Sequence, residues 1–108
     1  MESNQVAWAA GVIEGEGCFT IVKNSKAKNG MSAKFVLQMN DKDIVDRLFG
    51  LFGLGKVYHR PSRGSSKESW AWTIYKVSEL EKLIKLVLPW LGQRRASKAN
   101  EILEWIHV

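Results

Sequence analysis

Two glutamates near the start of the chain, Glu14 and Glu16, lie in a stretch with very little side-chain bulk. Glu16 is flanked by Gly15 and Gly17, so there is room beside its carboxylate for a metal ion, a phosphate group or another chain. The alternative is that both glutamates form the solvated end of a helix. The residues around them must therefore decide whether this is a site.

The stretch that carries these glutamates has the pattern of an apolar helix with one nearly bare face. Ala7, Gly11 and Gly15 are spaced four residues apart, which places them on the same side of a helix. Each glycine inside a helix costs about 1 kcal/mol relative to alanine, and close backbone approach by another helix is the usual compensation. We therefore predict that a second helix packs on this face, although such spacing also occurs in ordinary packing within one chain.

Positive charge is concentrated in two segments downstream of the glutamates. The net charge is +5, with four lysines and no acids between residues 18 and 40, and two lysines and two arginines without acids between residues 56 and 67. Cationic segments beside an acidic motif suit a polyanionic partner and a metal site better than a membrane. Solubility alone would be the simpler explanation of the charge.

Cysteine, histidine and hydropathy patterns exclude several other classes of protein. The single cysteine, Cys18, excludes an internal disulfide, and two separated histidines exclude a Cys/His zinc cluster. We expect an intracellular reducing compartment, because the start M-E-S-N-Q lacks a secretory signal and no apolar run could span a bilayer. The particular compartment is unknown from the sequence.

Alternation of apolar and polar residues predicts two β-hairpins, with strands at residues 18–26 and 32–40 and at residues 56–60 and 70–76. Their connections are a turn at residues 28–30 and a loop at residues 61–69. A helix over residues 41–52 follows the first hairpin, capped by Asn40 or Asp41. The capping-box pattern at residues 78–81 opens another helix that Pro89 stops, and a last helix runs from about Arg94. The order αββαββαα predicts one α+β domain over residues 1–108, with helices on one face of a four-stranded antiparallel sheet.

The uncovered face of this sheet should collect polar and basic side chains. Lys and Arg neutralise phosphates, and Asn, Gln, Thr and Arg can read base edges in a DNA major groove. Any one of these residues could simply belong to a solvated strand, but together they span three strands. The predicted set is Thr20, Asn24, Lys26, Lys34, Gln38, Lys56, Tyr58 and Arg60.

The stretch A-A-G-V-I-E-G-E-G at residues 9–17 resembles the nonapeptide after which the LAGLIDADG homing endonucleases are named. It matches at Ala10, Gly11, Ile13 and Gly17, and glutamates replace both aspartates. The order of elements, the P-W-L stretch at residues 89–91 and the basic pair before the last helix are also similar to single-motif members. The resemblance thus covers nearly the whole chain, which holds no second copy of the motif.

The resemblance implies a saddle-shaped sheet that lies along the major groove of double-stranded DNA. In the family, motif helices pair at the centre of a dimer, which accounts for Ala7, Gly11 and Gly15 and implies a homodimer with a near-palindromic target. The motif position of the metal-binding carboxylate falls on Glu16, and the carbonyl of Gly15 also coordinates. A divalent metal, Mg²⁺, would activate water for phosphodiester cleavage.

Three further positions take their roles from the resemblance. Glu14 matches a position that braces the motif helices. Asp41 matches a polar residue that orders metal-bound water, although a helix N-cap is an equally good account of it. Arg94 occupies the place of a lysine near the scissile phosphate; it would neutralise charge but transfers protons poorly, and Arg95 is the alternative occupant.

Three functions are compatible with these patterns. The first is a metal-dependent, site-specific DNA endonuclease encoded by a mobile intron or a similar element. The second is a non-cleaving nucleic-acid-binding protein of the same fold, an intron maturase with intron RNA as partner or a transcription regulator. The third is a basic α+β interaction domain whose motif match is accidental.

Overall fold

The computed structural model describes residues 1–27 and 30–107. Its element order confirms the predicted αββαββαα arrangement; Lys28 and Asn29 of the predicted turn lie outside the described residues. The elements are α1 (Ser3–Glu16), β1 (Gly17–Lys23), β2 (Met31–Met39), α2 (Lys42–Phe52), β3 (Lys56–Arg60), β4 (Ser69–Ile74), α3 (Val77–Val87), the 3₁₀ helix η2 (Leu88–Trp90) and α4 (Gln93–Ile106).

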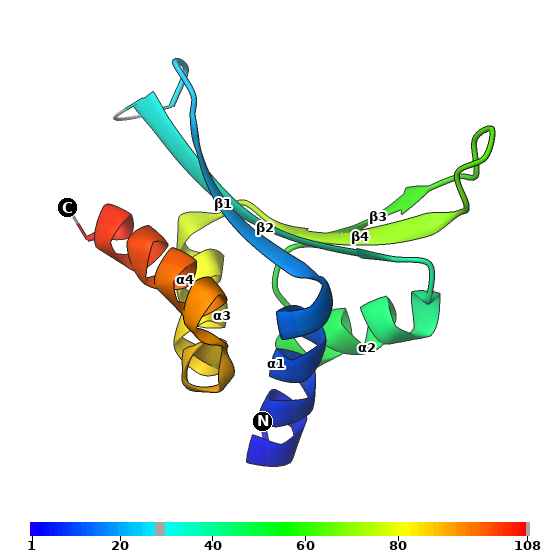
Figure 1. Cartoon of the computed structure of the whole chain (residues 1–108), viewed down its shortest axis with the longest axis horizontal. Helices are drawn as coiled ribbons and strands as arrows, with labels where there is room; N and C mark the ends of the chain where they lie inside the picture. Colours follow the sequence, from blue (N-terminus) through cyan, green and yellow to red (C-terminus); the bar gives the residue numbers. More distant parts are fainter. Residues whose placement is uncertain (28–29, 108) are drawn as a thin grey trace.

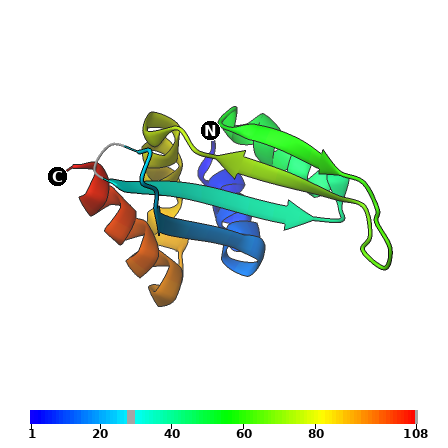
Figure 2. The same ribbon diagram turned by 90° about the horizontal axis from the view of Figure 1, so that it is seen from above.

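The four strands form one antiparallel sheet in the order β1-β2-β4-β3. Figure 1 shows that the sheet is curved and that the helices lie against its convex face, while Figure 2 looks onto the open, concave face. The predicted α+β fold with helices on one face is therefore confirmed.

Large apolar side chains of the central strands fix the sheet on the helices. Phe35 of β2 and Trp72 of β4 are fully buried and meet edge to face, with ring centroids 5.2 Å apart. Phe52 at the end of α2 stacks on Trp72 at 5.7 Å, and the Trp72 indole N–H donates a hydrogen bond to the Leu54 carbonyl at 2.8 Å. A buried indole therefore has its polar atom satisfied while it anchors β4 to the segment after α2.

On the open face, β4 contributes small side chains that do not reach solvent. Ser69, Ala71 and Thr73 share this face, and each is at most 5% exposed. Ala71 pairs with Gln38 of β2 on one side and with Tyr58 of β3 on the other. Side chains that could reach a partner therefore come from the strands that flank β4, while β4 itself forms the floor between them.

Two predicted details of the element ends are wrong. The strands expected over residues 18–26 and 70–76 end at Lys23 and Ile74. After β1 the chain turns at Asn24, whose side-chain oxygen accepts the Lys26 backbone N–H at 3.1 Å, and after β4 it passes into α3 at Val77. The predicted capping box at Ser78 is also absent. Helix α3 begins at Val77 with Lys76 as N-cap and no side-chain cap bond.

Among residues 1–27 and 30–107, no helix has both the length and the apolar character that a membrane crossing requires.

Candidate active site and nucleic-acid interface

Glu16 is the last residue of α1, and its side chain is exposed where the helix passes directly into β1. The next residue, Gly17, must be glycine for steric reasons, since a Cβ there would come within 2.8 Å of both the Ile13 carbonyl oxygen and the Phe35 ring. Its N–H bonds the Ile13 carbonyl and closes the helix. The abrupt transition from helix to strand leaves the exposed Glu16 directly before the first residue of β1, an edge strand of the sheet.

Glu14 connects the end of α1 to the beginning of α4. One of its carboxylate oxygens accepts a hydrogen bond from the Gly92 backbone N–H at 2.6 Å, and the other accepts a hydrogen bond from Arg95 Nη1 at 2.9 Å. The same guanidinium donates from Nε to the Gly17 carbonyl at 3.1 Å. We call these four residues, Glu14, Gly17, Gly92 and Arg95, the Glu14 brace. The brace holds the peptide segment that presents Glu16.

The brace lowers the pKa of the Glu14 carboxyl below its ordinary value of 4.5. The main cause is the hydrogen bond from the Gly92 N–H; partial burial opposes it, and the bond and charge of Arg95 add to it. Glu14 is therefore ionised at neutral pH. Because the folded-state pKa is the lower one, the brace contributes stability above pH 4.5, and this contribution is lost as the pH falls through the folded-state value.

We therefore expect Glu14→Gln to destabilise the protein at pH 7 by about 1 kcal/mol, a modest value because the carboxylate is partly exposed. The difference between the two proteins should shrink as the pH falls below about 4.5. Thermal unfolding followed by circular dichroism across pH 3 to 7 would measure it. The matched control is Glu104→Gln, at an exposed position of α4. If the stability of the wild type and that of the Glu14 variant changed with pH in the same way, the proposed role of the brace would be contradicted.

Of the two arginines that open α4, only Arg95 makes hydrogen bonds within the brace, although the charge of Arg94 also lowers the pKa of Glu14. Arg94 is exposed and makes no side-chain hydrogen bond or ion pair with any described residue. It lines a cavity of about 240 Å³ together with Gly17, Cys18, Phe19, Arg95 and Lys98. Arg94 is therefore the cation available to an anion that enters beside the end of α1.

Asp41 follows the end of β2 by two residues. Among the described residues, its side chain makes no hydrogen bond or ion pair with Glu14, Glu16 or Arg94. It occupies the N-cap position of α2, but its side chain makes no cap hydrogen bond. Its predicted role at the metal rests on the resemblance alone.

No helix of the described residues packs against the two glycines on the small-residue face of α1. The buried residues of α1, Val6, Ala9, Ala10 and Ile13, lie on the other side of the helix. A Cβ added at Gly11 or Gly15 would meet none of the described atoms within 4 Å, and both glycines are exposed. Neither helical glycine therefore has a compensating helix contact among the described residues.

Most of the predicted nucleic-acid contacts do lie on the open face. Thr20 of β1 and Lys34 of β2 are paired opposite each other. Gln38 of β2 lies beside β4, and its side-chain amide donates a hydrogen bond to the Ser69 hydroxyl at 2.8 Å. Lys56, Tyr58 and Arg60 alternate along β3 on the same side. Asn24 and Lys26 lie beyond the end of β1, in the turn of the first hairpin.

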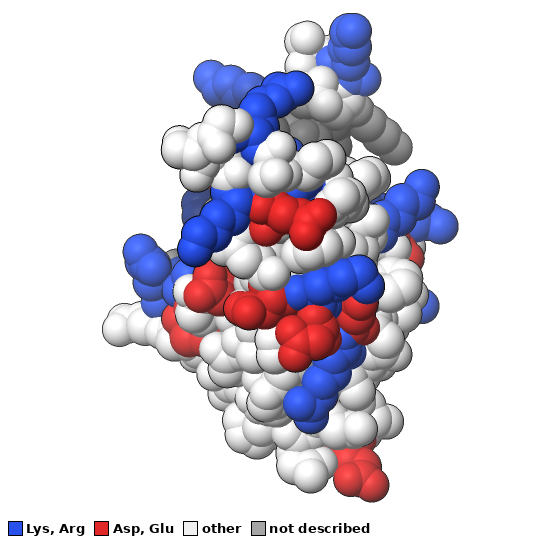
Figure 3. Space-filling model, turned by 90° about the vertical axis from the view of Figure 1, so that its right-hand side faces the viewer, with Lys and Arg blue, Asp and Glu red and all other residues white. Residues whose placement is uncertain are grey.

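Basic side chains project around the upper part of the molecule in the side view of Figure 3, where Figure 1 places the ends of the strands. Acidic side chains gather mainly across the middle of this view, with Lys and Arg side chains among them. Positive charge is therefore available to a polyanion at the ends of the strands.

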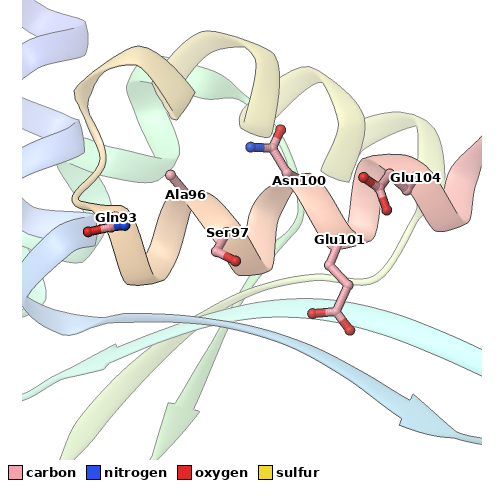
Figure 4. A pocket seen from close by; sticks show the side chains of 6 residues that line it. All are labelled: Gln93, Ala96, Ser97, Asn100, Glu101 and Glu104. Carbon is pink, nitrogen blue, oxygen red and sulfur yellow. The ribbon is translucent and has the colours of Figure 1, made fainter.

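A single chain offers an incomplete set of metal ligands. Within the described residues, no three His, Cys, Asp or Glu side chains come close enough to hold an ion. A hollow on α4 carries Glu101 and Glu104, but Figure 4 shows these side chains pointing apart, and Glu101 pairs with Lys98 at 2.9 Å. The exposed Glu16 carboxylate therefore fits a Mg²⁺ ion that takes its other ligands from phosphate and water.

Comparison with known proteins identifies the class to which this site belongs. A family model described as LAGLIDADG endonuclease matches residues 9–108, so the chain belongs to the LAGLIDADG endonuclease family. This excludes the interpretation of the motif as an accidental match. A comparison with curated protein sequences found no match.

Solved structures of homing endonucleases share the fold. The structure of I-CvuI in complex with its target in the presence of Ca has a TM-score of 0.77 and 18% identity, over 97% of this chain and 67% of that one. The DNA complex of I-CeuI has the same TM-score and identity, over 98% of this chain and 55% of that one. The structure of I-TnaI has a TM-score of 0.71 and 20% identity, over 98% of this chain and 71% of that one. The chain thus spans little more than half the length of I-CeuI.

Proposed function

We propose that this single domain of residues 1–108 is a site-specific DNA endonuclease that acts as a homodimer and hydrolyses phosphodiester bonds with a divalent metal. The observation that carries the proposal is the position of the exposed Glu16 carboxylate. It lies at the end of an unpartnered glycine face and beside an open sheet with basic side chains. Membership of the family and the DNA complexes of structural neighbours support the same conclusion.

Pairing of two α1 helices through Ala7, Gly11 and Gly15 would bring the two copies of Glu16 together near a twofold axis. Each carboxylate would then face one scissile phosphate, and the two curved sheets would extend in opposite directions along the duplex. A symmetric protein of this kind requires a near-palindromic target.

The local chemistry of the α1 terminus suits a bound Mg²⁺ ion. The Glu16 carboxylate would supply one ligand and the Gly15 carbonyl another; this carbonyl belongs to the last turn of α1, where backbone oxygens have no partner within the helix. The ion would activate water and stabilise the leaving oxygen. Arg94 would neutralise the charge of the phosphate without exchanging a proton, because a guanidinium stays protonated. Asp41 is proposed only as a more distant contributor.

The two arginines should therefore respond differently to substitution. We expect Arg94→Ala to slow cleavage by about 10- to 100-fold with an unchanged unfolding midpoint, because a charge-assisted bond to phosphate is lost. Arg95→Ala should lower the unfolding midpoint, because it opens the Glu14 brace. Cleavage kinetics and thermal unfolding measured on both variants check this. The assignment fails if Arg94→Ala destabilises the fold and Arg95→Ala does not.

Selection of bound duplexes from a randomised library tests the function as a whole. Binding in Ca²⁺ followed by exchange into Mg²⁺ should yield a near-palindromic site that is cut on both strands. The affinity should also fall with salt, with a slope of about 0.9 per phosphate contact on a double-logarithmic scale.

A non-cleaving role, as a maturase or a transcription regulator, is the second candidate. One observation favours it: Arg94 stands where the resemblance places a lysine. Selected duplexes that are bound in Mg²⁺ but stay intact would establish this candidate instead of the endonuclease.

A further inference from the structure

A second polar cavity lies at the edge of the open face, where β3 begins and β4 ends. Its volume is about 400 Å³, and it is lined by Gly55, Lys56, Tyr58, Thr73, Tyr75, Lys76 and Glu79. Strand β3 forms this edge of the sheet, on the side away from β1 (Figure 2). We call this cavity the tyrosine pocket.

The floor of the tyrosine pocket is made by close backbone packing. Gly55 has φ of 73°, and a Cβ at this position would come within 2.4 Å of the Thr73 carbonyl oxygen. The chain therefore enters β3 flat against β4. Lys56 pairs with Thr73 and Tyr58 with Ala71, whereas Tyr75 follows Thr73 by two residues. The two tyrosines thus stand on the same face, on either side of a low floor.

Both tyrosine rings are available to a ligand. Tyr58 is 44% exposed and Tyr75 is 59% exposed, and no aromatic contact of either ring is made within the described chain. An exposed ring beside lysines is the arrangement that binds unpaired nucleotides, because the ring stacks on a base and the ammonium group neutralises a phosphate. A duplex cannot use such a ring in this way, because its bases are already stacked on one another.

The charges around the pocket distinguish between nucleic acids. Lys56 and Lys76 supply two positive charges against the one carboxylate of Glu79. A carboxylate is unfavourable beside a phosphate, but it can accept a hydrogen bond from a ribose 2′-hydroxyl, a donor that DNA lacks. The geometry points to the tyrosine pocket as a binding site for an unpaired nucleotide of single-stranded RNA. This function goes beyond the proposed DNA cleavage and gives the second candidate, a maturase, a specific site for its RNA.

Fluorescence anisotropy with a short labelled oligouridylate, the matching oligodeoxyuridylate and a duplex DNA of the same length would test the site. Tyr75→Leu should weaken RNA binding about 10-fold or more, whereas Tyr75→Phe, which retains the ring, should keep the wild-type affinity. Glu79→Ala should reduce the preference for RNA over the deoxy strand. Duplex binding should be the same in all three variants, provided that circular dichroism shows them folded.

Lysine variants separate local contact from general charge. Lys76→Ala should weaken RNA binding more than Lys82→Ala, at an exposed position of α3 outside the pocket. The inference is overturned if Tyr75→Leu leaves RNA binding unchanged or weakens duplex binding equally. An equal affinity of the wild-type protein for the RNA and deoxy strands overturns the assignment to RNA. Because duplex cleavage is measured separately, failure of this inference leaves the proposed endonuclease intact.

Discussion

Glu16→Gln should abolish double-strand cleavage while the protein still binds its target in Ca²⁺. The substitution keeps the size of the side chain and removes the negative charge that would hold the metal. Mutation of a residue that only hydrogen-bonds a metal ligand typically lowers metal affinity or activity by about 10- to 100-fold. Loss of a direct ligand should therefore lower the cleavage rate by more than about 100-fold. Cleavage of a plasmid that carries the selected site, followed over time in Mg²⁺, measures the effect.

The matched control for this experiment is Glu104→Gln, which removes the same charge from an exposed position of α4. It should cleave at the wild-type rate. Undiminished cleavage by the Glu16 variant would reject the proposed metal ligand, and loss of DNA binding by that variant would instead show that Glu16 supports the interface. The two readouts, binding in Ca²⁺ and cutting in Mg²⁺, keep these outcomes apart.

Gly11→Leu should convert the proposed dimer into a stable monomer. A Cβ at Gly11 meets nothing within the described chain, and leucine is a better helix former than glycine by several tenths of a kcal/mol, so the monomer should not lose stability. In a close-packed pair of helices, overpacking costs about 1–3 kcal/mol at each of the two copies, which weakens the dimer by about 30-fold or more. Sedimentation velocity over a range of concentrations measures the shift, and cleavage should fall with it.

Gly50→Leu provides a matched control on another helix. Gly50 lies in α2, is exposed, and likewise has no described atom within 4 Å of an added Cβ. Its replacement should leave the oligomeric state and the cleavage rate unchanged. An unaltered dimer in the Gly11 variant would place the interface elsewhere.

Side-chain periodicity was sufficient to predict the architecture. Phe35 and Trp72 belong to alternating rows of large apolar residues along their strands, and the helices bury an apolar side. The order of elements and the open face of the sheet therefore follow from local patterns. Sequence reasoning failed at element ends. The hydrogen bond at Asn24 ends β1 early, and Lys76 takes the N-cap position expected of Ser78. Local side-chain bonds compete with regular structure at such positions.

Contacts between distant segments were beyond the reach of the sequence. Arg94 and Arg95 are adjacent and chemically identical, but successive residues of a helix point about 100° apart, so only one of them faces Glu14. Nothing in their spacing indicates which one it is. The partners of Glu14, Gly92 and Arg95, also follow no local motif. A polar position after β2 was predictable, but its separation from Glu16 depends on the register of β1 and β2.

The Glu14 brace can form only late in the synthesis of the chain. Gly92 and Arg95 lie 78 and 81 positions after their partner Glu14, so a ribosome releases the motif helix long before the residues that secure its end. Until α4 has been synthesised and docked, the carboxylate of Glu16 is attached to an unsecured helix terminus. Translation that stops before α4 would therefore yield a product that carries the acidic motif but does not cut DNA.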